Sequence, residues 1–151
     1  MKNSVRLAVK YAIYTAVALI VYFLALRTVD FHENPWFRVL NGIVVAFGIF
    51  SAIRDYKDEY VEDFSYVNGF KVGLITGFVS TILFAIFMAI YLFHIDTGFK
   101  DMLLRDWLHN VNQGGGLLIF ILLLEGFSSS VVITLANMQY FKKSTKIFQN
   151  T

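Results

Sequence analysis

The 151-residue sequence has no cysteine, a single proline and only 16% charged residues. The missing cysteines exclude thiolate nucleophiles, iron–sulfur ligation, zinc sites built on thiolates and a disulfide framework. The formal net charge is only +2, so the chain lacks the basic surface that nucleic-acid binding requires, and no nucleic-acid partner is expected. Intrinsic disorder is also excluded, because it requires low hydrophobicity.

Apolar residues are what the sequence has in excess. The chain is 57% hydrophobic with a mean hydropathy of +0.60. An average soluble domain is about 45–50% apolar and about 25% charged. This chain has too little polar surface to face water on all sides, so it is expected to be an integral membrane protein with the lipid bilayer as its surroundings.

The apolar residues are concentrated in long segments. A helix that crosses the bilayer needs on the order of 20 mostly apolar residues, and four segments, 5–26, 37–53, 69–93 and 117–138, come close to or exceed that length. We therefore predict an all-α integral membrane four-helix bundle that forms one domain over 1–151. The first segment could instead be a secretory signal, but no small-x-small cleavage pattern follows it, so a retained helix is expected.

Basic residues are distributed unevenly around these segments. Nine of the thirteen Lys and Arg residues lie in the N-terminus, the middle loop and the C-terminal tail, and four lie in the other two loops. Because cytoplasmic loops carry the excess of basic residues, both termini and the middle loop are predicted to be cytoplasmic. Ser65 in the middle loop is the expected N-cap of the third helix, and Pro35 marks the start of the second.

The loop between the third and fourth segments has a helical pattern of its own. Apolar residues recur at helical spacing over 97–111, with charged residues between them and Trp107 near the end. This pattern predicts a short amphipathic helix in the outer membrane interface. The glycines of 114–116 would then end the helix and return the chain to the bilayer.

The third segment carries a small residue at every fourth position. In lipid, such rows allow helix backbones to approach closely, which strengthens dispersion contacts. The first segment has a similar row and could be its partner. Packing within one bundle and packing against a second copy or another subunit both remain open. The row on the third segment is Gly69, Gly73, Gly77, Thr81, Ala85 and Ala89, and the row on the first is Ser4, Ala8, Ala12 and Ala16.

Glu125 is the one acidic residue inside a predicted span. An ionised carboxylate there costs at least ~2.5 kcal/mol, so it must be paired, protonated or in contact with water. No Lys or Arg is expected at the same depth, whereas Thr81, Ser80 and Thr15 are. One interpretation is proton or cation handling at the bundle centre. The other is an acid that bonds helices together or pairs with a basic residue of another subunit.

Other polar groups are weaker candidates. His32, His94 and His109 fall on the predicted outer side near carboxylates, but their spacing matches no metal motif, so no metal or cofactor is expected. The acidic residues of 54–63 are interpreted as a solvated face, with docking of a basic partner as the alternative. The chain has no nucleophile elbow, phosphate-binding loop or HExxH motif, and we predict that it is not an enzyme.

Part of the chain resembles a known family. Arg54-Asp55-Tyr56, then Phe64-Ser65-Tyr66, and the stretch 69–73 leading into a long apolar helix are similar to the central block of the bacterial family called domain of unknown function 4199. The resemblance implies a bacterial inner-membrane location and a four-helix fold. It implies no activity and no catalytic residue. The short, glycine-closed segment before the last span departs from the family pattern.

Taken together, these features predict a small non-catalytic inner-membrane protein. It would serve as an accessory or scaffolding subunit that packs against its own copies or a larger membrane complex. The alternative is a small proton-linked transporter or channel centred on Glu125.

Overall fold

The computed structural model describes residues 2–28, 35–60, 64–95, 98, 101, 104–105 and 115–148. The helices are α1 (Lys2–Thr28), α2 (Pro35–Glu59), α3 (Tyr66–Ile90) and α5 (Gly116–Phe148), and α3 continues into the π-helical segment η1 (Tyr91–Ile95). Over this part of the chain, four helices are long and apolar enough to cross a membrane, at 3–28, 39–59, 66–95 and 116–141. The predicted all-α four-helix architecture is confirmed.

Two helix starts follow from local chemistry. Pro35 is the first residue of α2. The backbone N–H of the first helical residue has no partner within the helix, so proline loses no hydrogen bond there, and its fixed φ is close to the helical value. Ser65 precedes α3 in an extended conformation, and its hydroxyl accepts a hydrogen bond of 3.2 Å from the backbone N–H of Asn68. This is the N-cap arrangement that the sequence predicted at Ser65.

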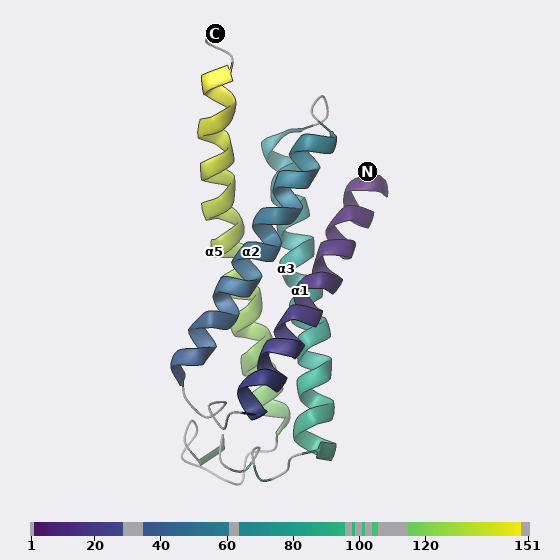
Figure 1. The fold of residues 1–151 in the computed structure, drawn as a ribbon, viewed down its shortest axis with the longest axis vertical. Helices are drawn as coiled ribbons and strands as arrows, with labels where there is room; N and C mark the ends of the chain where they lie inside the picture. The colour runs from purple at the N-terminus through teal and green to yellow at the C-terminus, as the bar shows by residue number, and fades with distance from the viewer. Residues whose placement is uncertain are drawn as a thin grey trace.

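The helices alternate in direction. Ala8 lies against Thr76 near one end of the bundle and Phe23 lies against Tyr91 near the other, so α1 and α3 run parallel with a constant residue offset. Gly73 and Gly77 of α3 meet Ile53 and Ile49 of α2 in reverse order, so α2 runs the opposite way. As Figure 1 shows, the start of α1, the end of α2, the start of α3 and the end of α5 lie at one end.

α3 is the central helix of the bundle and packs against α1, α2 and α5. Two adjacent rows of its side chains are buried. Residues three or four positions apart lie on the same face of a helix, so the two rows form one continuous buried face. One row comprises Val72, Thr76, Ser80, Phe84 and Met88, and the other comprises Gly69, Gly73, Gly77, Thr81 and Ala85. The first row faces α1 at Ala8, Leu19 and Phe23. The second row faces α5.

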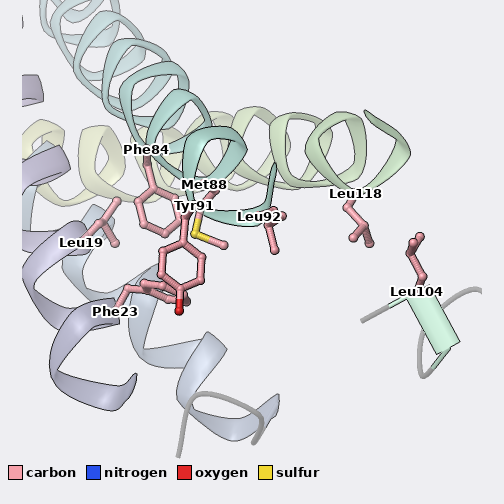
Figure 2. Packing of buried hydrophobic residues seen from close by; sticks show 8 residues of the cluster. All are labelled: Leu19, Phe23, Phe84, Met88, Tyr91, Leu92, Leu104 and Leu118. Carbon is pink, nitrogen blue, oxygen red and sulfur yellow. The ribbon is translucent and has the colours of Figure 1, made fainter. Parts of the chain in front are cut away.

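A cluster of buried apolar side chains, with Tyr91 among them, lies at the end of the bundle away from the termini (Figure 2). Tyr91 is completely buried, and its ring meets that of Phe23 edge to face with centroids 5.0 Å apart. The Arg27 guanidinium lies 5.0 Å from the centre of the Tyr91 ring. The cluster contains Leu19, Phe23, Phe84, Met88, Tyr91, Leu92, Leu104 and Leu118.

The helices are longer than the predicted apolar spans. α2 continues to Glu59 instead of ending near 53, and α5 continues to Phe148 instead of 138. Hydropathy marks only the part of a helix in hydrocarbon, whereas backbone hydrogen bonds continue through polar residues that favour helix. Of the expected interfacial helix over 97–111, Gly98, Asp101, Leu104 and Arg105 are described and helical. The rest of it lies outside the described residues.

Candidate functional site

The small-residue row of α3 forms one wall of a close contact with α5. A Cβ atom added at Gly73 would lie 2.5 Å from Thr134 Cγ2, and one added at Gly77 would lie 2.5 Å from Ser130 Cβ. One turn further on, the glycine belongs to α5 and the larger side chain to α3, because the Thr81 side chain packs over Gly126. Each helix therefore places side chains over glycines of the other, and we call this region the α3–α5 contact.

The partner of the row differs from the expected one. The row on α1 was the predicted candidate, but Gly69, Gly73 and Gly77 face α5. Ala8, Ala12 and Ala16 of α1 are buried as well, and Ala8 packs beside Val72 and Thr76 on the neighbouring face of α3. The α5 row of Gly126, Ser130 and Thr134 was missed, although its spacing of four is visible in the sequence.

Three buried hydroxyls in the bundle bond to their own helix. Thr15 donates to the Tyr11 carbonyl at 2.8 Å, Ser80 to the Gly77 carbonyl at 2.9 Å and Ser130 to the Gly126 carbonyl at 2.7 Å. Such bonds satisfy hydroxyls inside a membrane without a partner helix. Thr15 also fills the space above Gly48 of α2, so its role in the structure is packing between α1 and α2.

Glu125 lies near the middle of the fourth span, at the depth that the sequence indicated. Its neighbour Gly126 contacts Thr81, so Glu125 is level with Thr81 and Ser80 near the middle of the α5 span. The side chain is exposed on the outer surface of α5 and has an interaction within the chain. This placement does not favour the interpretation that puts it at the bundle centre, because the face of α5 that meets α3 is formed by Gly126, Ser130 and Thr134.

Polar residues join α1 and α2 at the end where the termini lie. The Tyr11 hydroxyl donates a hydrogen bond to the Asp55 carboxylate. Arg54 lies 3.8 Å from Asp58 one turn away, with both side chains about two-thirds exposed. These groups sit in the last turns of α2, where charged side chains can reach water. Over the part that the structure describes, Asp55, Asp58 and Glu59 of the acidic stretch are exposed.

The Tyr11–Asp55 bond is open to a direct test. Tyr11→Phe is expected to lower the free energy of unfolding by about 1 kcal/mol, because it removes one hydrogen bond to a partly exposed carboxylate. Chemical denaturation in mild detergent, followed by helical circular dichroism, measures the change. The neighbouring Tyr14→Phe is the control, since the Tyr14 side chain is 58% exposed. A double-mutant cycle with Asp55→Asn that gives simple additivity would contradict the bond.

Among the histidines, His94 is described, and its side chain is exposed in η1. His32 and His109 lie outside the described residues. Over the described part of the chain, no three histidine or carboxylate side chains come together in a way that could hold a metal ion.

The fold and the α3–α5 contact define a multi-pass α-helical membrane protein. A family model described as "Protein of unknown function (DUF4199)" matches residues 10–116, and the chain belongs to this family. The resemblance seen in the sequence is thus confirmed. No curated protein and no solved structure matches the chain. The match ends at Gly116, the first residue of α5, so Glu125 lies outside it.

Proposed function

We propose that this protein is a non-catalytic accessory or scaffolding subunit, which packs against its own copies or against a larger membrane complex. The observation that carries this proposal is the outer surface of α5, whose span has the smallest buried share among the four spans of the described residues. Apolar side chains around it are suited to lipid, including Phe120, Leu124 and Val132, which are 59%, 58% and 66% exposed. Glu125 lies among them and has an interaction within the chain.

The inner face of α5 is already occupied by α3 and α2. Its exposed apolar outer face is therefore the surface that remains for a further membrane helix. A proton path through one chain receives no comparable support, since Glu125 is not enclosed and Ser80 and Thr15 bond to their own helices.

The proposed location is the bacterial inner membrane, with both termini in the cytoplasm. Two observations support it. The chain belongs to the DUF4199 family, and its resemblance to this bacterial family implies an inner-membrane location. The parts of the chain with most Lys and Arg residues lie at the end of the bundle where the termini lie (Figure 1). The excess of basic residues on the cytoplasmic side gives the orientation.

The test is the mass of the assembly in a mild detergent or a polymer-bounded lipid disc. The native protein is expected at a multiple of its 17.3 kDa chain mass or with a stoichiometric partner. Leu124→Ala is expected to raise the share of monomers, because it removes apolar contact area from the exposed outer surface of α5. Lys71→Gln, a change at an exposed position of α3, is expected to leave the mass unchanged. A native protein that is monomeric and free of partners would contradict the proposal.

A further inference from the structure

Three aromatic rings join α2 and α5 at the end of the bundle where the termini lie. The rings of Phe50 and Phe141 stack with their centroids 5.3 Å apart. The Tyr140 ring meets that of Phe141 edge to face at 5.5 Å and that of Phe50 at 6.0 Å. Phe141 is buried, whereas the Tyr140 side chain is 64% exposed. The three rings therefore form one aromatic patch, which is buried at Phe141 and exposed at Tyr140.

Lys57 of α2 brings a positive charge to this aromatic patch. Its ammonium lies 5.6 Å from the centre of the Phe141 ring, and its side chain is partly buried. Within the part of the chain that the structure describes, this ammonium forms no salt bridge. An aromatic ring attracts a cation but does not replace a full hydrogen-bond acceptor, so the Lys57 ammonium retains N–H donors for an anion.

The acidic residues next to Lys57 in the sequence have other partners. Asp58 lies 3.8 Å from Arg54, and Glu59 accepts a hydrogen bond of 3.1 Å from the Tyr60 hydroxyl. Residues that share a helix face are three or four positions apart, so neither acid lies on the face of α2 that carries Lys57. An anion bound at Lys57 would not be opposed by a carboxylate of that face.

α5 adds positive charge and no negative charge beyond the aromatic patch. The helix continues to Phe148, and lysines occupy positions 142, 143 and 146, within two turns of the end of the span. Residues 126–151 contain no Asp or Glu. The electrostatic potential past the end of this span is therefore positive, and such a potential attracts anionic lipid headgroups.

The aromatic patch and Lys57 lie at a boundary of the membrane. Phe141 is the last residue of the α5 span, and Lys57 is two residues from the end of the α2 span at Glu59. The polar headgroups begin just outside the hydrocarbon. Tyrosine is enriched at that level, because its ring is apolar and its hydroxyl is polar. An ammonium, a phenol hydroxyl and an apolar surface thus lie where a phospholipid has its phosphate and the start of its acyl chains.

We infer that Lys57 and Tyr140 bind the headgroup phosphate of an anionic phospholipid. The Lys57 ammonium pairs with one phosphate oxygen, and the Tyr140 hydroxyl donates a hydrogen bond to another. The net positive charge of the α5 extension favours a headgroup that carries no ammonium of its own. This site goes beyond the proposed function, because all of its residues belong to one chain and it is the same in a monomer and in an assembly.

Native mass spectrometry of the purified protein tests the site. The protein in mild detergent is titrated with phosphatidylglycerol, which is anionic, and separately with phosphatidylcholine, which is zwitterionic. The native chain is expected to retain one phosphatidylglycerol at concentrations at which phosphatidylcholine is not retained. Lys57→Gln is expected to weaken this binding by on the order of tenfold, because it removes a charge-assisted hydrogen bond. Tyr140→Phe is expected to cause a smaller loss.

Two further variants separate a site from a general effect of charge. Lys71→Gln is the matched control, because it removes the same charge from an exposed position of α3 at the same end of the bundle, and no change is expected. Lys57→Arg keeps the charge and should retain binding, so an equal loss in Lys57→Arg and Lys57→Gln would contradict a role for the charge. Circular dichroism of each variant confirms that the helices are intact.

Three other outcomes would overturn the inference. Equal losses in Lys57→Gln and Lys71→Gln would indicate a general attraction of basic residues to anionic lipid, without a site at Lys57. Equal retention of the two lipids would show that the headgroup charge is not recognised. Displacement of phosphatidylglycerol by an equal concentration of inorganic phosphate would indicate a site for soluble phosphate instead of a lipid.

Discussion

Replacement of Gly77 by leucine is expected to force α3 and α5 apart and to lower the free energy of unfolding by about 1–3 kcal/mol or more. A Cβ atom at this position would lie 2.5 Å from both Cβ and Oγ of Ser130 and 3.1 Å from Ile49 Cδ1. Since Ser130 Cβ is fixed to its backbone, rotation of the side chain cannot relieve the clash. Titration of the protein from mild detergent into dodecyl sulfate, followed by helical circular dichroism, measures the loss.

Gly42→Leu is the matched control for this prediction. Gly42 lies in the α2 span, and a Cβ atom added there meets nothing within 4 Å. Both variants gain similar helix propensity from the loss of glycine, so their difference reports on packing alone. Gly77→Ala is expected to be destabilising as well, and Ser130→Gly in the same chain should restore part of the loss. Equal stability of Gly77→Leu and Gly42→Leu would show that α3 and α5 do not pack closely at this point.

The second large effect is expected at Tyr91, whose side chain is completely buried at the far end of the bundle. Tyr91→Ala is expected to cost about 3–5 kcal/mol, as for other large aromatic residues removed from a packed core. The cavity would remove the edge-to-face contact with Phe23 and the Arg27 guanidinium contact. These are packing losses, which persist in a membrane even though lipid is as apolar as the protein interior.

Tyr91→Phe separates the ring from the hydroxyl. It keeps the contacts with Phe23 and Arg27, so it should retain most of the stability that Tyr91→Ala loses in the same dodecyl sulfate titration. Phe23→Leu is expected to have an intermediate effect, because it removes one partner of the ring pair. If Tyr91→Ala unfolds at the same denaturant concentration as the native protein, the cluster does not stabilise the bundle.

The four spans and their alternating direction could be predicted from the sequence. Hydropathy identifies a membrane helix because the bilayer requires every backbone hydrogen bond to be satisfied within the helix, and this requirement acts on each segment separately. The helix ends were less predictable, as α2 and α5 show. Polar residues past the apolar limit continue these helices, and hydropathy contains no information about them.

The candidate site was predictable only in its parts. The spacing of Gly69, Gly73 and Gly77 indicated a close helix contact, which the structure places against α5. The choice between α1 and α5 could not be made from spacing, because both helices carry small residues at every fourth position. For the same reason the face of α5 that meets α3 was unknown, and the sequence left open whether Glu125 lies at the bundle centre.

The sequence by itself determined that this protein is an α-helical membrane protein with four spans, a row of small residues on the third and one acidic residue in the fourth. Those properties depend on the free energy of each residue in lipid or water, which is local. Only the tertiary structure decided that α3 is the central helix and that Glu125 lies on the outer surface of α5. These depend on the rotation of each helix about its axis, which is set by the fit of Thr81, Ser130 and Thr134 over glycines of the facing helix.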